Sequence, residues 1–364
     1  MRVEKYISKR GILRCLNKIR MIKRMRNRKR MSKSKLACLF ALLVFCSRSI
    51  AQDIHFSQFD QAMLWQNSAQ VGAFNGQFRF AANQRNQWRS VTTPYQTFGF
   101  SAEAKEFNAK PWSFGLNAGS DVAGDSRFRT SQVHLHAAHT LYKPNDSLEI
   151  RGGGSFGITS RGFDPSALVY DSQWNGLSFD PNLADNEIYA TTVRVYPSVG
   201  LAVFIHKQEN KFRWNAGYSL YNITRPRQSF MDNDAIVLDM RHAIQASARV
   251  SINQLYEVEV LSLFQIQGKM KELVFGPRVY YKLPSEKWEN QRVFAGIHGR
   301  FRDAAWIEMG VEYNEWRVGM SYDLNTSTLR PASTGRGGLE FSIVYIVPPK
   351  LKHGTLKKVC IPYY

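Results

Sequence analysis

The stretch that decides the fold reads FRWNAGYSL and runs from Phe212 to Leu220. Apolar side chains stand at every second position, beginning with Phe212 and Trp214, and small or polar residues stand between them. A period of two is typical of a β-strand, whose successive side chains point to opposite faces of the sheet. The same alternation recurs along the chain, in segments 112–119, 133–138, 244–250 and 339–345.

Strands with one apolar and one polar face fit either a soluble β-sandwich or an outer-membrane barrel. In a barrel the apolar face meets lipid, while Asn, Ser, Gly, Arg and His line the lumen. A length that is long for one sandwich favours the barrel, as do aromatic residues near strand ends, where a headgroup girdle would need them. We predict an all-β, transmembrane antiparallel β-barrel of about 14 strands over residues 77–347, with a strand-poor insertion at 160–186. The expected girdle residues are Trp88, Tyr95, Trp112, Tyr142, Tyr221, Tyr280, Tyr281 and Tyr322.

The basic character of the chain is confined to its first residues. The formal net charge is +20, and residues 1–51 contribute +15 of it. Met31 opens a second start, followed by lysines, an apolar run of 11 residues from Leu36 to Cys46, and small residues at Ser49 and Ala51. This pattern predicts a secretory signal peptide over 31–51 with cleavage before Gln52, and a basic leader over 1–30 that reflects a start annotated too early. We therefore expect no nucleic-acid partner, although a basic binding arm is the alternative interpretation of 1–30.

Few residues after the predicted cleavage site are candidates for a catalytic, metal-binding or cofactor-binding site. Of the four cysteines only Cys360 follows the predicted cleavage site, so neither an internal disulfide nor a Cys-x-x-Cys metal site can form there. The run Gly152–Gly157 fits two motifs, a hydrolase elbow around Ser155 and a dinucleotide loop, but no helical periodicity follows it, which favours a glycine-lined strand. His134, His136 and His139 lack further ligands nearby, which favours lumen-facing polar residues over a metal site. We expect no catalytic residue, no metal and no cofactor, and therefore no enzyme.

Several spaced blocks near the predicted cleavage site resemble one family. They are His55–Phe59, Gly72–Gly76, Ala82-Asn83, Arg85–Trp88 and Pro94–Phe98, and further blocks follow at Arg225–Phe230, Ser321–Asn325, Gly335–Glu340 and Cys360–Pro362. Together they resemble the PorP/SprF membrane proteins of the type IX secretion system over essentially the whole exported chain. Cys360-Ile361-Pro362 departs from the family, in which Cys more often directly precedes Pro.

The resemblance implies an outer-membrane component of a Gram-negative, Bacteroidota-type bacterium that supports protein export, surface attachment of cargo and gliding motility. It also implies four kinds of partner: outer-membrane lipid, the periplasmic ring, peptidoglycan-linked lipoproteins and secreted surface cargo. A diffusion porin for small solutes is the main alternative, and a secreted β-sandwich adhesin is a third.

Residues 52–76 precede the first expected strand, and we interpret them as an N-terminal periplasmic arm; residues 348–364 are expected to form a C-terminal tail. Large aromatic residues are the types that anchor interfaces, so Phe56, Phe59 and Trp65 are predicted to contact a partner. The alternative is that the arm folds into the lumen as a plug and touches no partner. Arg85, Asn86 and Trp88 are further candidates for partner contact, or else belong to the first strand, with polar side chains in the lumen and Trp88 in the girdle.

Overall fold

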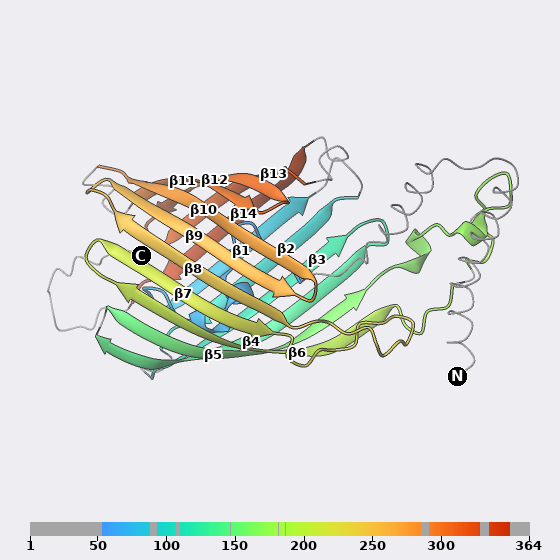
Figure 1. The fold of residues 1–364 in the computed structure, drawn as a ribbon, viewed down its shortest axis with the longest axis horizontal. Helices are drawn as coiled ribbons and strands as arrows, with labels where there is room; N and C mark the ends of the chain where they lie inside the picture. Colours follow the sequence, from blue (N-terminus) through green and yellow to red (C-terminus); the bar gives the residue numbers. More distant parts are fainter. Residues whose placement is uncertain are drawn as a thin grey trace, which may run out of the picture. The chain divides into compact units, whose positions relative to one another are not determined.

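The computed structural model describes residues 53–87, 93–106, 110–145, 147–180, 182–185, 187–284, 291–327 and 335–349. Fourteen antiparallel strands follow one another around a closed barrel, and β1 pairs with β14 to complete it (Figure 1). Closure gives every strand two neighbours, so that no edge is left unpaired in a hydrocarbon environment. The strands are β1 (Phe78–Gln87), β2 (Tyr95–Ala104), β3 (Trp112–Ala123), β4 (Phe128–Asn145), β5 (Leu148–Gly162), β6 (Val193–Gln208), β7 (Phe212–Tyr221), β8 (Arg241–Ser251), β9 (Tyr256–Gln267), β10 (Met270–Lys282), β11 (Gln291–Arg300), β12 (Ala304–Tyr313), β13 (Trp316–Asn325) and β14 (Arg336–Val347).

The closing pair has an uninterrupted register. Phe78 faces Val347 at one end, and Gln87 faces Gly338 at the other. We call the end at which β1 begins and β14 ends the near end, and the opposite end the far end. The connections at the near end include the short turns 209–211, 252–255 and 314–315, whereas the far end carries the connections 163–192 and 222–240.

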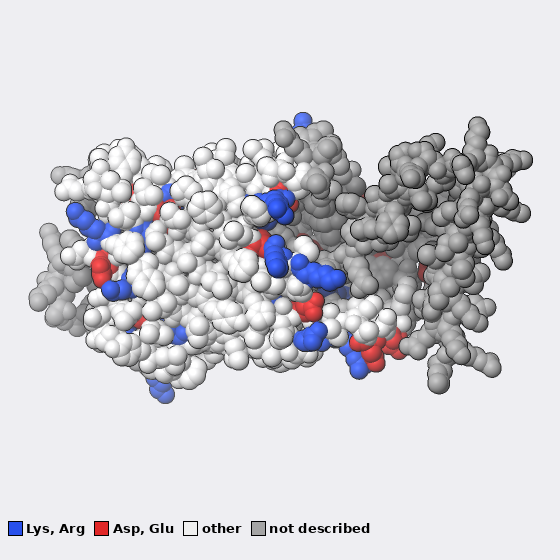
Figure 2. All heavy atoms as spheres, in the orientation of Figure 1, with Lys and Arg blue, Asp and Glu red and all other residues white. Residues whose placement is uncertain are grey.

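Alternation along each strand separates the two faces as the sequence predicted. In β3, Phe114 points outward and is exposed, while Ser113 and Asn117 point into the lumen and are buried. The outer surface is apolar across the barrel, and in the face that Figure 2 presents the charged side chains gather toward the two ends. This distribution fits a belt of lipid flanked by water on both sides. Among the described residues, no helix has the length and apolarity that crossing a membrane requires.

Two of the predicted girdle residues lie elsewhere. Tyr221 and Tyr280 are buried in the lumen, with 5% and 0% of their surface exposed. Trp112, Tyr142 and Tyr322 do face outward and are exposed, whereas Trp88 lies outside the described residues. A tyrosine near a strand end can face either way, because its ring suits a lipid interface and its hydroxyl suits a polar interior.

The two motif-like runs lie in strands. The run Gly152–Gly157 lies within β5, with Ser155 buried on the lumen side, as predicted for a glycine-lined strand. His134 and His136 both face the lumen from β4, also as predicted, and the His136 ring lies 2.7 Å from Asn117 Oδ1. For His139 the prediction is wrong, because this residue lies on the outward face of β4 beside Trp112, with ring centroids 4.7 Å apart. Within the described ranges, no three His, Cys, Asp or Glu side chains are placed to hold a metal ion. The predicted insertion begins later than expected, because β5 continues to Gly162.

Candidate functional site: the filled lumen

The lumen of the barrel is filled by the chain's own N-terminal segment. Residues 53–76, which we call the plug, form a short helix α3 (Met63–Gln66), a 3-10 turn η1 (Ser68–Gln70) and irregular backbone. Their apolar side chains are almost fully enclosed; Leu64 has 1% of its surface exposed and Val71 has 0%. The sequence-based interpretation put this segment in the periplasm, whereas the structure places its described part inside the barrel, as in the alternative interpretation.

One side of the lumen holds the plug through buried charges. Asp60 of the plug accepts two hydrogen bonds from the guanidinium of Arg278 on β10, at 2.7 and 3.1 Å. Arg278 also donates to Glu308 on β12 at 2.7 Å and to Glu259 on β9 at 3.2 Å. Arg278 is completely buried, so this cation is neutralised by carboxylates from the plug and two strands rather than by water.

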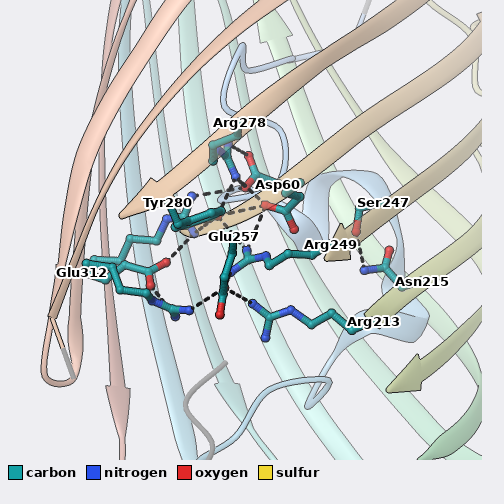
Figure 3. A network of polar contacts seen from close by, with 12 residues as sticks. Asp60, Arg213, Asn215, Ser247, Arg249, Glu257, Arg278, Tyr280 and Glu312 are labelled. Atoms are coloured by element: carbon teal, nitrogen blue, oxygen red, sulfur yellow. Dashed lines mark hydrogen bonds and ion pairs between the residues drawn. The ribbon is translucent and has the colours of Figure 1, made fainter. Parts of the chain in front are cut away.

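The ion pairs continue around this side of the barrel, as Figure 3 shows for the residues around Asp60. Arg249 on β8 donates to Glu259 at 2.9 Å and to the Tyr280 hydroxyl at 2.7 Å. The Arg317 side chain on β13 lies 3.6 Å from Asp60 and donates to Glu312 at 2.9 Å. Because the carboxylates and guanidiniums alternate, no buried charge in this group stands without an opposite one.

A second group of charged side chains binds the plug at Ser57 and Gln58, just before Asp60 in the sequence. The backbone N–H groups of Ser57 and Gln58 donate to the Glu340 carboxylate on β14, at 2.7 and 3.0 Å. The Ser57 hydroxyl donates to Asp323 on β13 at 2.9 Å. Arg85 on β1 donates to Asp323 at 2.7 Å and to the carbonyl of plug residue His55 at 3.2 Å. We call the lumen face of β8 to β14 together with β1 the charged wall.

On the opposite side of the lumen, glycines stand where the plug approaches the strands most closely. A Cβ at Gly99 on β2 would lie 2.7 Å from the Phe56 ring, and one at Gly119 on β3 would lie 2.6 Å from the Trp65 ring. At Gly153 on β5 a Cβ would meet the backbone of Ala69 at 2.6 Å. We call the lumen face of β2 to β7 the small-residue wall. Its glycines allow the plug to approach more closely than any side chain would permit.

Hydrogen bonds from this side end on plug carbonyls. Ser219 and Tyr221 of β7 donate to the carbonyls of Gln66 at 2.6 Å and of Leu64 at 3.1 Å. Arg151, a fully buried cation on β5, donates to the Ala69 carbonyl at 3.2 Å. These donors satisfy carbonyls in a segment that is too irregular to pair with itself.

Two small cavities lie beside the plug among the described residues. One cavity of ≈ 20 Å³ is lined by Asp53, Trp65, His134 and Arg241, among others. A second, also of ≈ 20 Å³, lies beside His55 and Glu272. Such a volume suits about one water molecule. Together with the burial of the plug's apolar side chains, these small volumes describe a lumen that the plug occupies.

The predicted contact residues fall into three places. Phe56, Phe59 and Trp65 are buried in the plug, with 3%, 6% and 5% of their surfaces exposed. Phe56 and Trp65 pack edge to face, with ring centroids 5.9 Å apart. Arg85 lies in the charged wall, Asn86 is half-buried near the far end of β1, and Trp88 lies outside the described residues. Contact of these residues with another protein stays a prediction.

Sequence reasoning missed the residues that hold the plug. Arg278, Glu259 and Glu308 stand among apolar neighbours at alternate positions of three strands. Charged residues at inward positions suit a watery lumen as well as a filled one, so alternation did not indicate their role. The glycine-rich run at 152–154 was a usable signal, because a glycine on a strand often marks a site where another backbone approaches closely.

Comparison with solved structures gives other barrels of low sequence identity. The toluene transporter TbuX of Ralstonia pickettii is 12% identical, with 78% of this chain and 92% of that chain covered and a TM-score of 0.46. The CymD monoaromatic hydrocarbon channel is also 12% identical, with 82% and 95% covered and a TM-score of 0.45. The toluene transporter TodX of Pseudomonas putida is 12% identical, with 80% and 94% covered and a TM-score of 0.44. No sequence among the curated proteins matches the chain.

A family match identifies the chain more directly. Residues 48–345 match the family described as "Type IX secretion system membrane protein PorP/SprF". This range includes the plug and all but the last residues of β14. A closed barrel with an apolar outer face crosses the outer membrane of Gram-negative bacteria. The chain therefore belongs to the PorP/SprF family and is an outer-membrane β-barrel of the type IX secretion system.

Proposed function

We propose that this barrel serves type IX secretion by supporting the export or surface attachment of cargo proteins, with gliding motility as a dependent process, and that it is not an enzyme. The observation that carries the proposal is the plug, held by buried charges inside a barrel of the PorP/SprF family. A barrel filled by its own chain leaves its surfaces, rather than its lumen, to take part in transport.

A small-solute porin is the alternative, and the packed lumen argues against it. A diffusion channel needs a continuous polar path, as in barrels whose lumen holds water. Here Leu64, Trp65 and Val71 lie inside the lumen and are buried against the strands. We therefore expect low conductance from the purified barrel.

The partners that we propose are those of a membrane-anchored secretion machine: outer-membrane lipid, the periplasmic ring and its peptidoglycan-linked lipoproteins, and a secreted surface protein as cargo. In this structure, contact of the ring with Phe56, Phe59 or Trp65 would require the plug to leave the lumen.

Deletion of the gene tests the function. We expect one or more surface proteins to accumulate in the periplasm, while uptake of small solutes stays unchanged. Comparative proteomics of surface and periplasmic fractions, together with solute uptake assays, measures both. Normal surface proteins with reduced uptake would favour the porin instead.

A second experiment separates a plug from a partner-binding arm. Phe56→Ala combined with Trp65→Ala removes two buried rings that meet edge to face inside the lumen. If the segment serves only as a plug, conductance in planar bilayers should rise while crosslinking to ring components stays intact. Loss of crosslinking by a barrel that stays closed would instead indicate partner contact by these residues.

A further inference from the structure

Two connections at the far end of the barrel form one structured unit. The backbone N–H groups of Ala190 and Thr191 donate to the Phe230 carbonyl, at 2.9 and 3.3 Å. The Phe230 ring packs edge to face on Phe163, with centroids 5.1 Å apart, and Phe163 packs on Tyr189 at 5.0 Å. We call the described residues of 163–192 and 222–240 the two-loop lobe, and its aromatic base fixes the two connections to each other.

The outer part of the longer connection has a framework of its own. Ser172 Oγ donates to the Asp185 carbonyl at 2.6 Å, and Gln173 Nε2 donates to the Leu183 carbonyl at 3.2 Å. Two 3-10 turns, η3 (Pro165–Ala167) and η4 (Asp171–Gln173), add local order. Side chains on this framework are therefore held in place rather than presented by an unstructured loop.

Large apolar side chains stand exposed on this framework. Leu177 has 91% of its surface exposed, Ile188 has 87% and Val169 has 71%. Trp174 and Met231 are exposed as well, with 58% and 50% of their surfaces accessible. These residues lie beyond the strands that face lipid, so the lipid belt does not explain them. Clusters of exposed apolar side chains outside a membrane mark interaction surfaces.

The charge of the longer connection gives the chemistry of the partner. Residues 163–192 contain five acidic residues and no lysine or arginine: Asp164, Asp171, Asp180, Asp185 and Glu187. In the shorter connection, Arg225 and Arg227 pair with Asp239 and Asp234 and so add no unpaired basic patch. A surface that is acidic and apolar complements one that is basic around an apolar centre.

The position of the lobe decides on which side of the membrane the partner lies. Outer-membrane barrels carry short turns on the periplasmic side and longer loops on the extracellular side. Both connections of the lobe leave the far end, opposite the end at which β1 begins and β14 ends. The lobe therefore faces the cell exterior.

We infer that the two-loop lobe is the docking surface for the secreted cargo, and that it binds a face of that cargo which is basic around an apolar patch. The inference rests on the proposed function, because it takes the partner to be the protein that the barrel helps to deliver. Leu177, Ile188 and Trp174 supply the apolar contact, and the surrounding carboxylates supply orientation and a salt-dependent part of the affinity.

The test uses the purified barrel in lipid nanodiscs and, as the probe, the purified protein that the gene deletion leaves in the periplasm. Leu177→Ser with Ile188→Ser should weaken binding roughly tenfold or more, as expected for the loss of interface anchors. Both side chains are mostly exposed, so the substitutions leave the barrel fold intact, and the heat-modifiable gel shift verifies this. The matched control is Ile252→Ser with Leu255→Ser, an exposed apolar pair in a near-end turn, which should bind as the parent does.

A second pair tests the charge. Asp171→Asn with Glu187→Gln should weaken binding and reduce its dependence on ionic strength between about 0.05 and about 0.5 M. Glu209→Gln with Glu315→Gln, two carboxylates of near-end turns, should change neither. Unchanged affinity and salt dependence in the lobe variant would contradict the proposed charge complementarity.

A photocrosslinker at position 177 identifies the occupant in cells. Crosslinks to the cargo support the inference, whereas crosslinks only to a second copy of this chain or only to lipid overturn it. Parent-like binding by the Leu177→Ser, Ile188→Ser variant also overturns the inference and leaves the proposed function standing. A gene deletion that strands no surface protein would instead overturn the proposed function and this inference with it.

Discussion

The two walls of the lumen hold the same plug in opposite ways. The charged wall offers guanidiniums and carboxylates that meet Asp60, Ser57 and Gln58 at hydrogen-bond distance. The small-residue wall offers glycines, such as Gly119 and Gly153, against which the plug packs without intervening side chains.

The difference shows that the charged wall fixes the orientation of the plug, whereas the small-residue wall fixes the shape that the plug must fit. A buried ion pair contributes little net stability, because desolvation offsets the Coulomb attraction, but removing one partner is costly. The charged wall therefore penalises any plug position that separates Asp60 from Arg278 or removes the Ser57 and Gln58 N–H donors from Glu340. The small-residue wall imposes a shape through its glycines and adds single donors, such as Ser219 and Arg151, to plug carbonyls. Its main cost is expected when that shape is changed.

The largest effect is expected from breaking the charged wall at its centre. Arg278→Ala leaves the carboxylates of Asp60, Glu259 and Glu308 without their shared cation. We expect a loss of about 3–5 kcal/mol in the free energy of unfolding, the cost of uncompensated buried charge. Denaturant titration of the barrel in lipid measures it.

The control for this substitution is Arg225→Ala, which removes an exposed pair with Asp239. An exposed pair contributes about 0–1 kcal/mol. Equal losses from Arg278→Ala and Arg225→Ala would mean that the charged wall does not hold the plug.

The outer faces of the two walls should behave alike. Leu116 on β3 and Ile307 on β12 both point away from the lumen. Arginine at either position should cost about 2–4 kcal/mol near the membrane midplane, because both meet lipid. Folding yield into lipid, read from the heat-modifiable gel shift, compares them. A much smaller loss at one position would show that its face does not meet lipid there.

A smaller loss should follow from filling the small-residue wall. At Gly153→Ala the new Cβ would meet the backbone of Ala69, so the plug must shift. We expect about 1–3 kcal/mol, the usual cost of overpacking, with a rise in conductance. Gly154→Ala is the matched control, since its Cβ would point outward and lie 3.6 Å from the nearest atom. If both variants match the parent, close approach at Gly153 is not needed.

The smallest effect concerns pH and the plug's own titratable groups. Burial lowers the pKa of His55 to about 4. Burial alone would raise the pKa of the Asp60 carboxyl, but the Arg278 guanidinium holds it well below its usual range. A released plug would bind a proton at His55 below about pH 6.5, so acidification disfavours the seated plug from there down to about 4. The contribution of Asp60 is present at neutral pH and is lost only below about pH 4.

Conductance of the purified barrel should therefore rise modestly as the pH falls from neutral to mildly acidic, and more steeply below. His55→Gln should reduce the rise in the upper range and keep the steeper one. Conductance that falls on acidification would contradict the assigned direction of both shifts.

Alternation was enough to predict the barrel, because each strand has one side toward lipid and one toward the interior. It predicted about 14 strands and the outward direction of Phe114 and Leu116. It could not decide what fills the interior, since a polar inward residue suits water, another side chain or a plug. The same ambiguity explains why Tyr280 is predicted in the girdle. In the structure its side chain faces the lumen, and its hydroxyl donates to Glu259 in the charged wall. Buried ion pairs such as Asp60 with Arg278 join residues 218 positions apart, which no local pattern encodes.

The contact between Ser57 and Glu340 spans 283 positions of the chain and has a consequence for assembly. The plug continues directly into β1, and β1 closes the barrel by pairing with β14. The hydrogen bonds from the Ser57 and Gln58 N–H groups to Glu340 therefore cannot form before the last strand is in place. Closure that depends on such distant partners is slow, and until the later strands are in place Phe59 lacks its buried neighbours, which lie on β8, β9, β10 and β12.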